Sequence, residues 1–113
     1  IKDKIEKINQ NNVYIDQLNL ETPNELRNFA LQIVNETDVD ITILYSSING
    51  KNTIVGATKN NVSLDISHII TEISKLYGGG ASKDADLSIG GGPNNFDTLK
   101  TLNIAKELIL KES

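Results

Sequence analysis

An Asn49-Gly50 pair lies between two runs that are rich in β-branched residues, at positions 41–45 and 52–57. Both residues of such a pair accept a positive φ, so the pair favours a tight turn between two antiparallel strands. The first run is almost continuously apolar, as expected for a strand that is covered on both faces. The pair therefore predicts a β-hairpin inside a layered fold.

An amphipathic helix is expected on each side of this hairpin. Thr22-Pro23-Asn24-Glu25 forms a capping box with proline at the first helical position. The apolar face behind it comprises Leu26, Phe29, Ala30, Ile33 and Val34. After the hairpin, Ser63 or Asp65 can cap a second helix, and Gly78 is expected to end it. The face of that helix comprises Ile66, Ile69, Ile70, Ile73 and Leu76.

The remaining elements extend this alternation of strands and helices. Residues 13–20 and 85–89 are expected to be strands, and a closing helix is expected after Asn94 or Asn95. The apolar face of the closing helix comprises Phe96, Leu99, Leu102, Ala105, Leu108 and Ile109. In a chain of 113 residues, this order predicts a single α/β domain with helices packed on a mixed sheet of about four to five strands.

The first residues show the spacing of a helix. Ile1, Ile5 and Ile8 recur at the i, i+4, i+7 spacing of an amphipathic helix, with no capping residue before them. The chain also contains no Met. We therefore expect residues 1–12 to be the end of an upstream linking helix and its turn, and residues 13–113 to be the domain. Such a helix could also join two copies in a homodimer.

The composition argues against catalysis and against a strongly basic surface. There is no Cys, and His68 is the only histidine, so neither a zinc cluster nor a catalytic triad is expected. The pairs Asp84/Asp86 and Asp38/Asp40 are expected to be solvated. The net charge is −4, so any RNA contact must use a local patch. No apolar run approaches the length of about 20 residues that a bilayer requires, and a cytoplasmic protein with no membrane partner is expected.

Two glycine triplets depart from the ordinary pattern of a domain. Six glycines within fifteen residues, in the segment GGGASKDADLSIGGG, cost about 0.5–1 kcal/mol each relative to Ala in regular structure. One interpretation is close approach of the backbone to a phosphate at the start of the closing helix, assisted by Ser82 and Lys83. The alternative is that Gly78 ends one helix, Gly92 turns into the next, and the others permit tight packing.

Four lysines could support an RNA contact if the fold brings them together. Lys51 and Lys59 flank the second strand of the hairpin, Lys75 ends a helix, and Lys83 lies between the triplets. The alternative is a scattered, solvated set. Tyr45 and Tyr77 could stack on an exposed base, although the apolar surroundings of Tyr45 favour the core. The candidate site residues are Gly78, Gly79, Gly80, Ser82, Lys83, Gly90, Gly91, Gly92, Lys51 and Lys59.

The glycine segment also carries a family resemblance. A helix that ends in three glycines, a short spacer, three further glycines and an amphipathic closing helix resembles the DHH-associated domain. That domain closes alanyl-tRNA synthetase and accompanies DHH-family phosphoesterases. Ile54-Val55-Gly56-Ala57-Thr58-Lys59 resembles the strand before the long helix of the family, and residues 13–20 with Thr22-Pro23 resemble its entry. The resemblance extends from about residue 13 to residue 110.

The resemblance implies a non-catalytic module that binds alanine-specific tRNA and couples the other domains of a parent synthetase. ATP, magnesium and zinc would belong to that parent, and no cofactor is expected in this chain. In the phosphoesterase relatives a His follows the first triplet, whereas Ala81 stands there in this chain, which favours the synthetase branch. Two alternatives are the substrate-binding subdomain of a DHH phosphoesterase and a structural dimerisation module.

Overall fold

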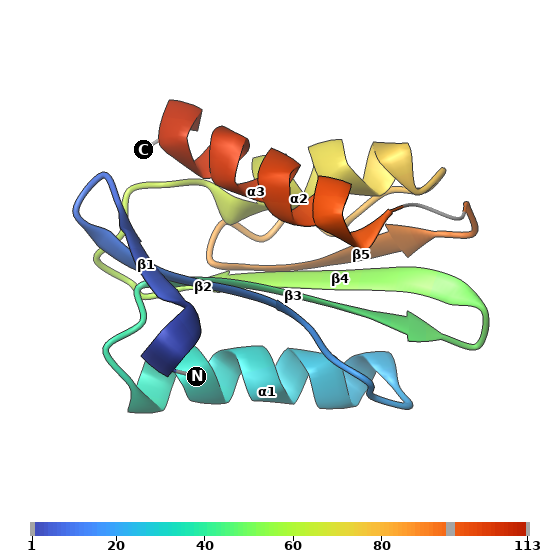
Figure 1. Ribbon diagram of the computed structural model, residues 1–113, viewed down its shortest axis with the longest axis horizontal. Coiled ribbons are helices and arrows are strands. Elements are labelled where there is room, and N and C mark those ends of the chain that lie inside the picture. The colour runs from blue at the N-terminus through green and yellow to red at the C-terminus, as the bar shows by residue number, and fades with distance from the viewer. Residues whose placement is uncertain (1, 95–96, 113) are drawn as a thin grey trace.

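The computed structural model describes residues 2–94 and 97–112, and over these residues the chain is a three-layer α/β domain (Figure 1). These residues form a five-stranded mixed sheet. Helix α1 covers one face of the sheet, and α2 and α3 cover the other. The elements are a 3-10 turn (Lys2–Lys4), β1 (Ile5–Ile8), β2 (Asn11–Gln17), α1 (Pro23–Glu36), β3 (Ile41–Ile48), β4 (Lys51–Thr58), α2 (Ile66–Leu76), β5 (Leu87–Gly92) and α3 (Thr98–Glu112). The predicted fold class is confirmed.

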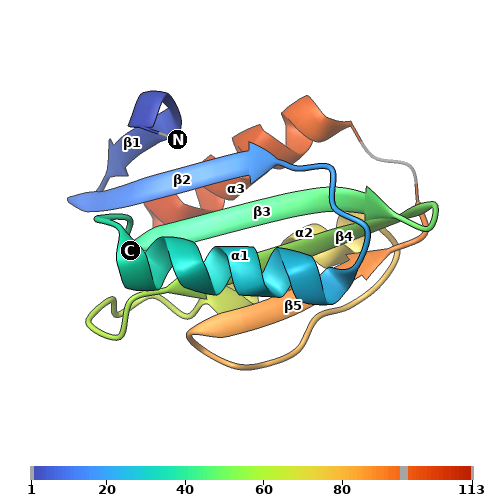
Figure 2. The ribbon, with the colours of Figure 1, turned by 90° about the horizontal axis from the view of Figure 1, so that it is seen from below.

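The strands lie in the sheet in the order in which they occur in the chain. Only β2 and β3 are parallel, with Val13 beside Ile41, because α1 carries the chain back to the starting edge between them. The other neighbouring pairs are antiparallel. Seen from below, α1 lies across the middle of the sheet (Figure 2). Strand β3 is buried on both faces. Ile43 packs in the core between the sheet and α2, and Leu44 packs in the core between the sheet and α1.

The capping box begins α1 as predicted. The N–H of Glu25 donates to Thr22 Oγ1 at 3.1 Å, and the Thr22 hydroxyl donates to Glu25 Oε1 at 3.2 Å. The face of α1 that packs on the sheet consists of Leu26, Ala30, Ile33 and Val34. Phe29, which the sequence places on that face, is 37% exposed at its margin.

The Asn-Gly hairpin is also confirmed. Asn49 and Gly50 have φ values of 53° and 77°, and Ile48 pairs with Lys51 across the turn. On the neighbouring helix, Asp65 accepts a hydrogen bond from the N–H of Ser67 and caps α2. Ile66, Ile69, Ile70 and Ile73 are fully buried against the sheet. Gly78 follows α2 with a φ of 86° and ends the helix, as predicted.

The predicted helix at the start of the chain is wrong. Residues Ile5–Ile8 form β1, which pairs with β2 through a two-residue turn in which Asn9 and Gln10 have φ values of 48° and 71°. Residues three apart in a strand point to opposite faces, and both faces of this sheet are covered by helices. Ile8 therefore enters the core beneath α2 and α3, while Ile5 packs on the α1 side. Residues 5–8 and 11–12 thus belong to the sheet, and Ile1 lies outside the described residues.

The segment before α3 also differs from the prediction. Strand β5 includes the whole second triplet, because Gly90, Gly91 and Gly92 pair with Ile54, Thr53 and Asn52 of β4. In place of Asn94 or Asn95, Asp97 caps α3 by accepting a hydrogen bond from the N–H of Leu99 at 2.8 Å. Asn95 and Phe96 lie outside the described residues. In the described part of the chain, no helix has the length and apolar character needed to cross a membrane.

Candidate nucleic-acid interface

The fold brings the two glycine triplets side by side. Gly91 N donates to Gly80 O at 3.3 Å, and Ala81 forms an isolated antiparallel bridge with Gly90. Asn94 N donates to Tyr77 O at 2.7 Å, so the chain that leaves β5 passes back across the end of α2. The first triplet therefore runs along the outer edge of β5.

Three of these six glycines are required by this close packing. A Cβ atom on Gly79 would overlap the carbonyl oxygen of Gly91, and one on Gly92 would overlap the carbonyl oxygen of Tyr77. On Gly90 it would overlap the hydroxyl of Ser74. These contacts leave no space for a side chain, so packing accounts for the three residues.

Two further glycines are required by their backbone conformation. Gly78 has a φ of 86°, and Gly91 has a φ of 151° with its Cβ position against the carbonyl oxygen of Asn52. Residues that carry a side chain rarely adopt such φ values. Packing and conformation together thus explain every residue of the triplets except Gly80, which has no positive φ and no atom within 4 Å of its Cβ position.

The first triplet is accessible to a partner. Gly78, Gly79 and Gly80 are exposed, and the three glycines of β5 are half-buried. The predicted phosphate cradle at the start of α3 is wrong, however, because the second triplet lies within a strand rather than before the helix. The carboxylate of Asp97 also occupies the cap of α3, where a phosphate would otherwise gain from the helix dipole.

Between the triplets, Ser82 has a structural role and Lys83 is free to act. Ser82 N donates to Ile89 O at 2.9 Å, and Ser82 Oγ accepts from Ile89 N at 3.0 Å. Ser88 Oγ donates to the carbonyl oxygen of Ser82 at 2.6 Å. These bonds hold Ser82 and its neighbours against β5. Lys83 is exposed and has no ion pair within residues 2–94 and 97–112.

The candidate lysines do not converge. Lys51 begins β4 and Lys59 follows its end, so their backbones are roughly 25 Å apart. Lys59 Nζ donates to the carbonyl oxygens of Val34 and Thr37 and so caps the C-terminus of α1. Lys75 forms an ion pair with Glu72 at 2.8 Å. Of the four, Lys51 and Lys83 remain exposed without such partners among the described residues.

The two tyrosines are core residues rather than stacking platforms. Tyr45 is 7% exposed and its hydroxyl donates to Thr98 O at 3.1 Å, while the Tyr77 hydroxyl lies 2.9 Å from Thr101 Oγ1. Both contacts hold the start of α3 on the sheet. Burial, with smaller contributions from Tyr77 and Asp16, raises the pKa of Tyr45 to about 12. Burial also raises the pKa of Tyr77, so both phenols remain protonated at neutral pH.

Sequence patterns alone did not reveal Asn52 and Asn94. Asn52 Nδ2 donates to the carbonyl oxygen of Asn94, and the Asn94 side chain lies beside Gly78, 2.6 Å from the position of an added Cβ. The two residues are 42 positions apart and meet only because β4 and β5 pair. The amide of Asn94 thus lies next to Gly78, and the amide of Asn52 is bound to the Asn94 backbone.

Comparison with known proteins adds to this geometry. No family model matches the chain. Among solved structures, the crystal structure of the C-Ala domain from Aquifex aeolicus alanyl-tRNA synthetase is similar to it, with a TM-score of 0.84 and 24% sequence identity. The likeness covers 95% of this chain and 98% of that chain. The chain has the fold of a C-Ala domain.

A second structure, of an uncharacterized protein from Helicobacter pylori G27, matches with a TM-score of 0.42 and 16% identity. This chain spans only 28% of that protein, and the score is too low to indicate a shared fold. The likeness to the C-Ala domain does not favour the phosphoesterase or the dimerisation alternative.

Within the C-Ala fold of this chain, the two aspartate pairs have different surroundings. Asp40 Oδ2 accepts from the N–H of Asn12 at 2.8 Å, and Asp38 O accepts from Asn12 Nδ2. Asp84 and Asp86 are exposed. Among the described residues, no three His, Asp or Glu side chains gather closely enough to hold a metal ion.

Proposed function

We propose that this chain is the C-terminal domain of an alanyl-tRNA synthetase and that it binds tRNA without catalysing a reaction itself. The proposal rests on the extent of the likeness to the Aquifex C-Ala domain, which spans 95% of this chain and 98% of that one. Because the likeness covers nearly all of both chains, it concerns the whole arrangement of layers and strands rather than one common motif.

In this proposal the domain is an appendage that holds alanine-specific tRNA and couples the other domains of the parent enzyme. The parent, acting in the cytoplasm, would supply the ATP, magnesium and zinc that ligation and editing require. The part assigned to the present chain is recognition through backbone and side-chain contacts.

We place the tRNA contact at the surface formed by Gly78–Gly80, Asn52 and Asn94, with the exposed Lys83, three residues after Gly80, at its margin, and call it the glycine face. Gly80 is the glycine of this face that the fold does not require, and a bare backbone permits a polyanion to come close. The amide of Asn94 and the adjacent lysine provide donors for phosphate or sugar oxygens.

The distribution of charge supports the same surface. Lys59, at the other end of β4, is engaged by α1, and Glu36, Asp38 and Asp40 lie at that end of the molecule. A tRNA backbone would be repelled there. The net charge of −4 also limits the strength of binding, so we expect a weak, salt-sensitive contact that the rest of the parent enzyme reinforces.

The test is the affinity of the chain for an alanine tRNA transcript, measured by fluorescence anisotropy over a series of salt concentrations. Gly80→Val is expected to weaken binding roughly fivefold or more, because two methyl groups would separate the backbone from the RNA. Lys83→Ala should lower the slope of log K against log salt by about 1 if this lysine meets a phosphate. Lys111→Ala removes the same charge from the far end of α3 and serves as the matched control.

The outcomes separate the tRNA-binding role from the choice of surface. Absence of binding by the unmodified chain at low salt would contradict the tRNA-binding role. Binding that survives Gly80→Val unchanged would place the contact on another surface. A slope that falls equally in Lys83→Ala and Lys111→Ala would show that only the overall charge matters.

A further inference from the structure

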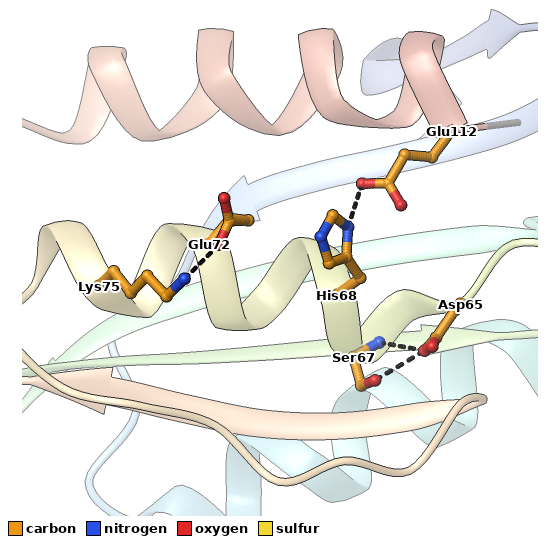
Figure 3. A network of polar contacts seen from close by, with 6 residues as sticks. All are labelled: Asp65, Ser67, His68, Glu72, Lys75 and Glu112. Carbon is orange, nitrogen blue, oxygen red and sulfur yellow. Dashed lines mark hydrogen bonds and ion pairs between the residues drawn. The ribbon is translucent and has the colours of Figure 1, made fainter.

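The last turn of α3 is held by polar contacts from two distant parts of the chain. Glu112 Oε2 lies 2.6 Å from Nδ1 of His68, which stands in the first turn of α2 and points across the gap between the helices (Figure 3). On the other side, Asn9 Nδ2 in the β1–β2 turn donates to Leu110 O at 2.9 Å. Beneath both contacts Ile109 is fully buried in the core.

Carboxylates face His68 from both helices. Glu112 comes from α3, while Asp65 and Glu72 come from α2, one at its cap and one a turn further along. Glu72 is itself paired with Lys75 at 2.8 Å, and Asp65 accepts hydrogen bonds from Ser67 (Figure 3). Glu112 is therefore the carboxylate that contacts the imidazole directly.

We propose that the contact between His68 and Glu112 is a pH-sensitive latch that sets how firmly the last turn of α3 is docked on α2. A protonated imidazole forms an ion pair with the carboxylate in addition to the hydrogen bond, whereas a neutral imidazole retains only the hydrogen bond. The contact joins two elements 44 residues apart, so a change in its strength acts on packing between helices and not on either helix alone.

The direction of the effect follows from the pKa of His68. The hydrogen bond and the charge of Glu112, with smaller contributions from Glu72 and Asp65, raise this pKa above its ordinary value of 6.5. The protonated form is thus favoured in the folded state. The stabilisation is fully present below pH 6.5 and is lost as the pH rises through the raised pKa.

The test is NMR on the whole chain between pH 5.5 and pH 8.5. The His68 ring is titrated, and amide exchange of residues 108–112 is expressed as protection relative to the intrinsic rate at each pH. Protection is expected to be about two- to fivefold greater at the acidic end, the size of effect found for exposed ion pairs. Glu112→Gln should lower the pKa of His68 and abolish this difference. Glu107→Gln, an exposed change on the same helix, should preserve it.

A second variant separates charge from hydrogen bonding. His68→Gln retains a neutral donor and should hold the protection of residues 108–112 at the alkaline level throughout the range. Protection that is independent of pH in the unmodified chain would overturn the latch. So would a pH dependence that persists in His68→Gln or Glu112→Gln.

Discussion

The two glycine triplets are identical in sequence, but the fold uses them differently. Gly78-Gly79-Gly80 leaves the end of α2 and is exposed, whereas Gly90-Gly91-Gly92 is paired within β5 and half-buried. The second triplet is contacted along both edges. Strand β4 pairs with one edge, and the first triplet lies along the other. Its glycines are needed so that three backbone segments can lie against one another.

This difference shows that glycine content alone does not indicate a ligand site. Five of the six glycines are explained by contacts or conformations within the described residues, and Gly80 is not. The position that carries functional information is therefore the one where the fold would tolerate a side chain. Three substitutions test this distinction, in order of their expected effect on stability.

Gly91→Val should have the largest effect. Its Cβ would overlap the carbonyl oxygen of Asn52, and a β-branched residue is strained at a φ of 151°. Backbone strain and overpacking together predict a loss of roughly 3 kcal/mol or more in the free energy of unfolding. Urea denaturation followed by circular dichroism measures it, with Gly91→Ala as the milder variant if the valine form does not fold. A loss below about 1 kcal/mol would show that β4 and β5 can separate easily.

Gly78→Ala should have an intermediate effect. The left-handed conformation costs a side chain about 1–2 kcal/mol, while the neighbouring Asn94 side chain is exposed and can move away. Gly50→Ala is the matched control, because Gly50 has a similar φ of 77° but no atom within 4 Å of its Cβ position. Equal losses in the two variants would assign the whole cost to backbone conformation. A much greater loss at Gly78 would indicate that Asn94 is held firmly.

Gly80→Val should change the unfolding free energy by no more than about 0.5 kcal/mol, as is usual for exposed positions without special contacts. The same variant is expected to weaken tRNA binding, so stability and affinity should separate at this residue and at no other glycine of the triplets. Thermal denaturation beside the anisotropy titration provides both values. A loss of stability comparable to that of Gly78→Ala would place Gly80 with the structural glycines.

The two hairpins show how far local sequence could predict the fold. Asn49-Gly50 carries a strong turn signal and lies between β-branched runs, and it was identified correctly. Asn9-Gln10 adopts the same pair of positive φ values without a glycine, so nothing local distinguished it from a polar helix end. The spacing of Ile5 and Ile8 then suggested a helix, because periodicity in a short segment cannot show that both faces of a strand will be covered.

The candidate site was predictable only in part. The glycine segment was identified as exceptional from the sequence, and its first triplet was correctly placed at the end of α2. The role of Lys59 could not be seen, because its partners are carbonyl oxygens of Val34 and Thr37, residues more than twenty positions earlier. Backbone acceptors carry no residue-specific signal. The contribution of Asn52 and Asn94 likewise depends on the pairing of two strands.

The sequence by itself determined the elements whose signals are local: the Thr22 capping box, the Asn49-Gly50 turn, the isoleucine face of α2 and its end at Gly78. These features depend on hydrogen bonds and φ values within a few residues, which neighbouring side chains dictate. Only the tertiary structure decided that β1 joins the sheet, that the second triplet is a strand, and that Gly80 alone is unconstrained. Those outcomes depend on which surfaces meet, and the meeting surfaces come from residues far apart in the chain.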